Sequence, residues 1–202
     1  MKNVIRIRTL VALAVVGVIM SVTRIGNAVV LADNDPFLGI ALECHDYIRE
    51  NDFYYSKGVE LPLDREGNKR VDCSSYVSWC LYEYTGGDFN LSRDSAWFMK
   101  VAKALANKQT PDMADITSEW KVITNHELEP GDIMCYNGHV HIYAGTDGDG
   151  RRYVYNAGGD ESIQDEVTII SEGYFQKSKY ALRIPWYKPV LPAFFIIYKF
   201  DK

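Results

Sequence analysis

A cysteine and two histidines are the residues of this chain best suited to nucleophilic chemistry. Cys73 directly follows Asp72, and aspartate is a residue type that caps helices by accepting the free amide protons of the first turn. A thiol at that position feels the positive end of the helix dipole, which we expect to favour the reactive thiolate. His139 and His141 are two residues apart and face the same side of a strand, so either could serve as the base.

Each of these residues also has an interpretation that does not involve nucleophilic catalysis. A free cysteine is often simply buried, and Cys73 heads an apolar helix stripe. Two histidines on one strand face could bind a metal ion, although no third ligand has an obvious matching position. Asn156, at the end of the next predicted strand, could accept a hydrogen bond from an imidazole or could be a turn residue before Ala-Gly-Gly. We interpret His45 and His126 as ordinary solvated or capping histidines.

The elements that must position these residues follow from the spacing of apolar side chains. The pattern predicts helices over 35–51, 73–85 and 92–105, followed by a polar loop over 107–119. Asn137-Gly138 is a strong hairpin signal. Runs of β-branched and aromatic residues predict strands at 120–123, 133–136, 139–144, 153–156, 167–170 and 180–184. Helices followed by antiparallel strands indicate an α+β fold.

The N-terminal segment, residues 1–32, differs from the rest of the chain. Lys2, Arg6 and Arg8 precede an uncharged apolar run over residues 10–22. This pattern is typical of an export signal peptide, and an uncleaved membrane anchor is the alternative. We therefore expect residues 33–202 to form one catalytic domain that is secreted, at the cell surface or periplasmic. The apolar tail after Pro185 could be an edge strand or a surface that packs on a partner.

Charge and cysteine content restrict the possible partners. The chain carries a formal charge of −5, and removing the four basic residues of segment 1–32 leaves −9 on the remainder. An acidic domain is not suited to binding nucleic acid, which requires a basic surface. We expect contact with a membrane only through the N-terminal segment. The four cysteines contain no Cys-x-x-Cys pair, so a zinc knuckle is not expected. If Cys73 stays free, at most one disulfide can form among Cys44, Cys80 and Cys135.

Several motifs, in order, resemble those of the NlpC/P60 cysteine peptidases over residues 53–184. The run 72–77 is similar to the family's Asp-Cys-Ser-Gly-aliphatic motif, and 128–133 to its Leu-x-Pro-Gly-Asp-aliphatic strand entry. The run 139–145 resembles its His-Val-Gly-Ile-Tyr-x-Gly strand. Residues 153–157 correspond to the segment that carries the third polar residue, and 181–184 to the closing strand.

The resemblance implies a papain-like fold and a role for each matching residue. Cys73 would be the nucleophile, His139 rather than His141 the base, and Asn156 the third polar residue, where the family usually has histidine. Tyr55, three residues before Gly58, fits a Tyr-x-x-Gly motif whose tyrosine helps to bind substrate or stabilise the oxyanion, and Tyr54 is the rival. Helix-start amides, including that of Ser74, would complete the oxyanion site. No metal or cofactor is implied.

The resemblance further implies that the substrate is the stem peptide of bacterial peptidoglycan. The cleaved bond would lie next to D-glutamate, often between D-glutamate and a diamino acid. The chain departs from the family at Ser75 and His141, where glycine is usual. The Asp-Cys-Ser-Ser variant also resembles the CHAP amidases, which cleave the sugar–peptide amide. The alternative from another functional class is a domain that binds the cell wall and has weak or no catalytic activity. We expect the protein to be a monomer. A toxin delivered to other bacteria would have the same active site as a housekeeping enzyme, so the sequence does not distinguish these two roles.

Overall fold

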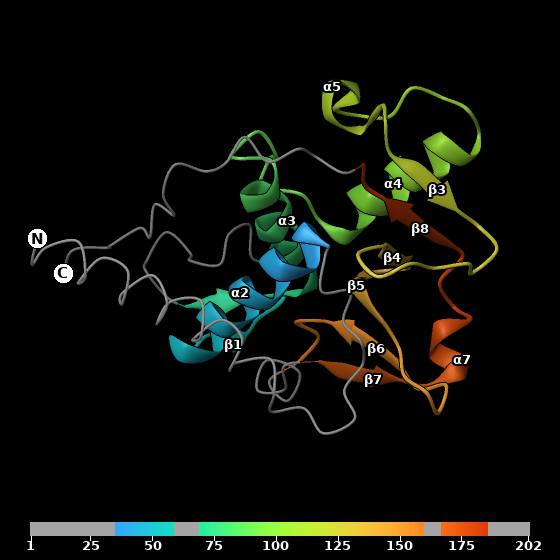
Figure 1. The fold of residues 1–202 in the computed structure, drawn as a ribbon. Coiled ribbons are helices and arrows are strands. Elements are labelled where there is room, and N and C mark those ends of the chain that lie inside the picture. Colours follow the sequence, from blue (N-terminus) through green and yellow to red (C-terminus); the bar gives the residue numbers. More distant parts are fainter. Residues whose placement is uncertain (1–34, 59–68, 160–166, 186–202) are drawn as a thin grey trace, which may run out of the picture.

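The computed structural model describes residues 35–58, 69–159 and 167–185, and within them the chain forms the expected α+β arrangement (Figure 1). Six antiparallel strands form one sheet in the order β3-β8-β4-β5-β6-β7. The strands are β3 (Lys121–Ile123), β4 (Ile133–Tyr136), β5 (His139–Thr146), β6 (Arg152–Tyr155), β7 (Thr168–Ile170) and β8 (Tyr180–Arg183). The predicted strands are therefore confirmed to within two residues at either end.

Three helices cover one face of this sheet. They are α2 (Pro36–Glu50), α3 (Cys73–Tyr84) and α4 (Ser95–Ala106), and each begins after an aspartate whose carboxylate caps its first turn. The α3 helix packs on β5, while α4 packs on β4 and β8. Val140, Ile142 and Ala144 of β5 point into this core, as the alternation of the strand predicts.

The opposite face of the sheet is covered by a short helix, α7 (Glu172–Phe175), that the sequence analysis did not predict. Ser171 caps it, and its Phe175 is buried with Met134, Tyr143 and Val154 of the sheet. The guanidinium of Arg152 lies 4.1 Å from the centroid of the Phe175 ring and pairs with Glu172. These contacts fix α7 on the sheet.

Two further elements were not predicted. The strands β1 (Tyr54–Tyr55) and β2 (Arg70–Val71) pair in parallel, between the first two predicted helices. The expected loop over 107–119 contains a one-turn helix, α5 (Ala114–Thr117). The N-terminal segment 1–32, expected to be a signal peptide or membrane anchor, and most of the tail, residues 186–202, lie outside the described residues.

The four cysteines are all free and buried. Cys44 of α2 and Cys80 of α3 are in side-chain contact, and the Tyr76 hydroxyl donates to the Ala41 carbonyl oxygen at 2.8 Å beside them. His45 is 1% exposed and lies near the rings of Tyr76 and Tyr155. The interpretation of His45 as solvated is therefore wrong, because the interface of α2 with α3 and the sheet encloses it.

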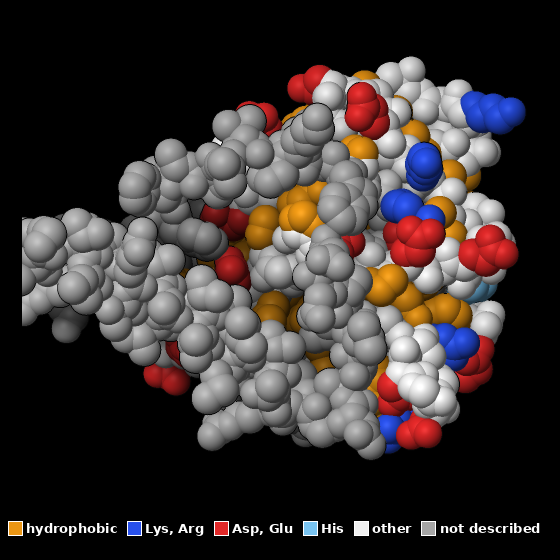
Figure 2. Space-filling view, viewed as in Figure 1, with side chains coloured by type: hydrophobic (Ala, Val, Ile, Leu, Met, Phe, Trp, Pro, Cys, Tyr) orange, Lys and Arg blue, Asp and Glu red, His pale blue; other side chains and the backbone are white. Residues whose placement is uncertain are grey.

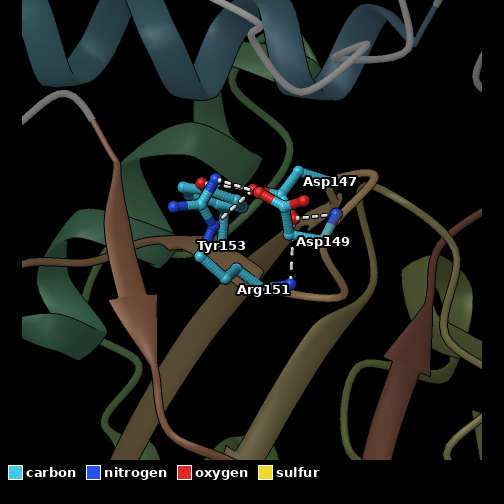
Figure 3. Close-up of polar contacts among 4 residues, drawn as sticks. All are labelled: Asp147, Asp149, Arg151 and Tyr153. Carbon is cyan, nitrogen blue, oxygen red and sulfur yellow. Dashed lines mark hydrogen bonds and ion pairs between the residues drawn. The ribbon is translucent and has the colours of Figure 1, made fainter.

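The turn between β5 and β6 is held by one carboxylate (Figure 3). Asp147 accepts hydrogen bonds from the Arg151 guanidinium at 2.7 Å and from the Tyr153 hydroxyl at 2.8 Å. It also accepts from the amides of Asp149 and Arg151. This network fixes the start of β6, the strand that leads to Asn156.

A buried ion pair joins the loop before β4 to the last strand of the domain. Asp132 is 1% exposed, and the Arg183 guanidinium donates to both of its carboxylate oxygens at 2.8 Å. On the face drawn in Figure 2, acidic and basic side chains are interspersed over the described residues. Among the described residues, no helix has both the length and the apolar character needed to cross a membrane.

Candidate active site

The site begins at the capped start of α3. Asp72 Oδ1 accepts the amides of Ser74 and Ser75 at 3.0 and 2.8 Å and the Ser74 hydroxyl at 2.9 Å. The Ser75 hydroxyl accepts the Asp72 amide at 2.9 Å, which completes a capping box. Ser75 thus has a structural task at the position where the NlpC/P60 motif has glycine. Cys73, the first helical residue, is held rigidly by this cap.

The same carboxylate holds the segment that carries the two candidate tyrosines. Asp72 Oδ2 accepts the Gly58 amide at 2.9 Å, and the parallel pairing of β1 with β2 adds the bond from the Ser56 amide to the Val71 carbonyl. Tyr55 is half-buried, and burial is the main cause that raises the pKa of its phenol. The charge of Cys73 raises this pKa further, so the phenol and the thiol lie within electrostatic range of each other. Tyr54 is 49% exposed and points elsewhere. The geometry therefore favours Tyr55 over Tyr54.

The Cys73 thiol is almost enclosed, with 6% of the residue exposed. Main-chain amides of Val140, Ser74 and Cys73 itself contact the sulfur and favour its anion. Burial, together with the nearby Asp72 carboxylate, outweighs them and raises the pKa of the thiol to about 11. The amides at the helix start thus favour the thiolate, as expected, but desolvation exceeds their effect and the free thiol keeps its proton near neutral pH.

His139 is the first residue of β5 and the chain neighbour of the residue that contacts the thiol. It immediately precedes Val140, whose amide contacts the sulfur, and the Asn156 side chain lies against its imidazole. Burial lowers the pKa of His139, while the Asn156 contact and the Asp72 charge act in the opposite direction. Asn156, just after β6, thus contacts His139, and His139 adjoins the residue of β5 that contacts Cys73 of α3.

The contact between Asn156 and His139 is poorly aligned. Asn156 is 9% exposed, and its Oδ1 meets no donor at good hydrogen-bonding geometry among the described residues. Catalytic hydrogen bonds are often loose before substrate binds. The chain turns back closely over this amide at Gly158, where any Cβ would lie 2.5 Å from Asn156 Nδ2. A larger residue at position 158 would have to displace the Asn156 side chain.

His141 is more deeply buried than His139 and has no polar partner. It is 2% exposed, and neither of its ring nitrogens makes a hydrogen bond to a described residue. Its ring lies edge-on to that of His139 with centroids 4.3 Å apart. Burial, and then the charge of His139, hold the pKa of His141 well below its ordinary value. The described residues contain no cluster of three or more potential metal ligands that would include this pair.

Tyr174 is a residue of the site that the sequence analysis missed. Its phenol lies on α7, and its pKa is raised first by burial and then by the charge of Cys73, so the two groups lie within electrostatic range of each other. The Tyr174 ring stacks on Tyr136 and on His141. No motif in the run 171–175 indicates such a position, because only the packing of α7 on the sheet creates it.

Ser74 takes part in the cap as well as contacting the Cys73 sulfur through its amide. Both its hydroxyl and its amide donate to Asp72, and the residue is 6% exposed. Cavities of about 490 and 590 Å³ lie elsewhere, around Asp132 and Arg183 and beside α4, and Cys73 lines neither. In comparisons with protein-family models, curated proteins and solved structures, nothing matches this chain.

Proposed function

We propose that the chain is an exported cysteine hydrolase with the papain-like architecture of the NlpC/P60 family, which cleaves amide bonds in peptidoglycan stem peptides. The observation that carries the proposal is the convergence of three elements on one thiol. Cys73 begins a capped helix, the amide of Val140 contacts its sulfur, and the adjacent His139 is backed by Asn156. A nucleophile, a base and a group that orients the base form the general arrangement of a cysteine hydrolase.

The proposed mechanism starts from a neutral pair rather than a preformed ion pair. A thiol with its pKa raised to about 11 and an imidazole with its pKa lowered are both uncharged near neutral pH. His139 therefore removes the thiol proton as the sulfur attacks the amide carbonyl, which forms a tetrahedral oxyanion. Main-chain amides around the sulfur, with the Tyr55 phenol, stabilise this anion.

The remaining steps follow from the same groups. The His139 imidazolium returns its proton to the leaving amine, the carbon–nitrogen bond breaks, and an acyl-thioester remains on Cys73. Water, deprotonated by the neutral His139, then attacks the thioester and releases the acid and the thiol. The chain's own residues supply every proton transfer.

The direct test is digestion of purified peptidoglycan by the full chain, with product masses read out. The matched variants are Cys73→Ser, which keeps the size of the side chain, and Cys44→Ser, which changes a buried cysteine of α2 that contacts Cys80. We expect new stem fragments from the wild type and from Cys44→Ser, and none from Cys73→Ser.

Other products would select the alternatives. Intact stems released from the glycan would identify a CHAP-type amidase that uses the same residues. Unaltered sacculi, together with a thiol that a cysteine-directed probe does not label, would favour the wall-binding domain. Cleavage that persists in Cys73→Ser would refute the proposed nucleophile.

A further inference from the structure

We propose that Tyr174 is a substrate-binding residue, whose hydroxyl hydrogen-bonds a peptide amide group of the stem next to the scissile bond. The inference rests on the proposed function, because it assigns part of the binding site beside the same nucleophile. It also makes α7, on the sheet face opposite the three long helices, one wall of the substrate site.

The position of the Tyr174 ring is fixed from two sides. Its centroid lies 4.8 Å from that of Tyr136 at an interplanar angle of 27°, and 5.6 Å from that of His141 at 25°. Both supporting residues are buried, at 4% and 2% exposure. Stacked aromatic rings at these separations stabilise one another beyond the area that they bury. We call these three rings the aromatic shelf.

The aromatic shelf lies beside the nucleophile. The Cys73 sulfur contacts the amide of Val140, and His139 and His141 flank Val140 in β5. The His139 and His141 rings meet at 4.3 Å, and the Tyr174 ring stacks on His141. One layer of side chains therefore connects the reacting thiol to the Tyr174 phenol, in agreement with the effect of the Cys73 charge on the pKa of that phenol.

Two kinds of polar group on the aromatic shelf are available to a ligand. Both ring nitrogens of His141 are buried without a hydrogen-bond partner among the described residues, and the hydroxyl of half-buried Tyr174 makes no side-chain hydrogen bond to them, whereas the Tyr136 hydroxyl contacts Met134 Sδ at 3.8 Å. Buried polar groups are normally satisfied, and an unsatisfied one requires an explanation. The Tyr174 phenol and the His141 imidazole are uncharged near neutral pH. They therefore match a neutral peptide amide better than a carboxylate, because an amide both donates and accepts hydrogen bonds.

The experiment separates binding from cleavage. Binding of a synthetic stem peptide, with D-glutamate followed by a diamino acid, is measured by calorimetry on the full chain carrying Cys73→Ala. The variants added to this background are Tyr174→Phe, which keeps the stack and removes the hydroxyl, and Tyr54→Phe, which removes an exposed hydroxyl of the same kind. We expect Tyr174→Phe to weaken binding about 10-fold, the loss of one hydrogen bond, and Tyr54→Phe to leave it unchanged.

The same substitutions with Cys73 intact give the second readout. Tyr174→Phe should raise KM about 10-fold and change kcat less than about 3-fold, because a binding contact made equally in the ground and transition states affects KM alone. Equal affinities and equal KM values for Tyr174→Phe and Tyr54→Phe would overturn the inference. Cleavage by the wild type would still uphold the proposed function in that case.

Two further outcomes are also decisive. Peptide binding that depends on Tyr174 without any cleavage would uphold this inference and refute the hydrolase. A chain that neither binds nor cleaves the peptide would refute both. Circular dichroism of Tyr174→Phe provides the structural control, because a variant that fails to fold would assign the hydroxyl a structural role and overturn the inference.

Discussion

At the residue scale, Tyr55 is the side chain whose proposed role in the oxyanion site can be tested by removing one atom. Tyr55→Phe should lower kcat about 10- to 100-fold with little change in KM, because the phenol is proposed to donate only to the developing oxyanion. Steady-state kinetics on the stem peptide measures this effect. Tyr54→Phe, the neighbouring change on the exposed side of β1, should behave as the wild type, and the opposite result would assign the role to Tyr54.

The protonation states at the site predict the pH dependence of the reaction. His139 acts as a base only when neutral, and burial lowers its pKa below the ordinary value of 6.5. Activity should therefore persist below pH 6.5 and be lost only as the pH falls through this lowered pKa. The thiol titrates far above neutrality, near 11, so kcat/KM should form a broad plateau between the two limits. An acid limb above pH 6.5 would contradict this assignment.

Asn156 offers a separate test through the same profile. Its contact with the imidazole raises the pKa of His139, opposing burial. Asn156→Ala should therefore move the acid limb of kcat/KM to lower pH, besides lowering the plateau as the ring loses its orientation. A pH–rate profile of the variant beside the wild type measures both effects. An unchanged acid limb would show that Asn156 does not contact His139 in solution.

At the element scale, the start of α3 shows that Ser75 has a structural task in the helix cap. The Ser75 hydroxyl accepts the Asp72 amide at 2.9 Å, so the first turn is closed from both sides. Ser75→Gly removes this bond and loosens the backbone of the helix. We expect a loss of about 1–2 kcal/mol in the free energy of unfolding.

Urea denaturation of Ser75→Gly measures that loss. Ser92→Gly is the matched control, since Ser92 is exposed and precedes α4 outside its cap, and this change should shift the free energy of unfolding by less than about 0.5 kcal/mol. Equal stabilities for the two variants would show that the capping box does not stabilise α3. Because the cap also positions Cys73, Ser75→Gly should lower kcat as well.

Helix capping and strand alternation explain how much of the fold was predictable. Asp35, Asp72 and Asp94 cap the three long helices, and Asn137-Gly138 closes the hairpin where the sequence indicates it. These are local signals, carried by adjacent residues. The elements β1, β2 and α7 lack such signals, because a strand of two residues or a single helical turn shows no repeat, and they form through contacts with distant parts of the chain.

At the scale of the whole molecule, the ion pair of Asp132 with Arg183 joins the loop before β4 to β8, 51 residues later. Arg183→Leu should reduce the free energy of unfolding by about 3 kcal/mol at pH 7.5, because it leaves a buried carboxylate without its partner. Arg49→Leu removes a more exposed pair with Asp46 and should cost less than about 1 kcal/mol.

The pH dependence of this loss gives a further check. Burial already raises the pKa of Asp132 against the opposing effect of Arg183, so removal of Arg183 should raise that pKa further. Protonation then relieves the unpaired charge, and the destabilisation by Arg183→Leu should shrink as the pH falls from 7.5 towards 4.5. Urea denaturation at both pH values measures it. A cost that does not change with pH would mean that Asp132 does not carry the loss.

The sequence by itself determined the α+β order of elements, the capped helix that starts at Cys73, and the strands that carry His139 and Asn156, because capping and periodicity are local properties of the chain. Only the tertiary structure decided the environment of these residues. Burial made the thiol and imidazole neutral, packing placed Tyr55 rather than Tyr54 beside the sulfur, and α7 brought Tyr174 to the site from 101 positions along the chain. Desolvation and stacking depend on which distant surfaces meet, and no short pattern of residues encodes that.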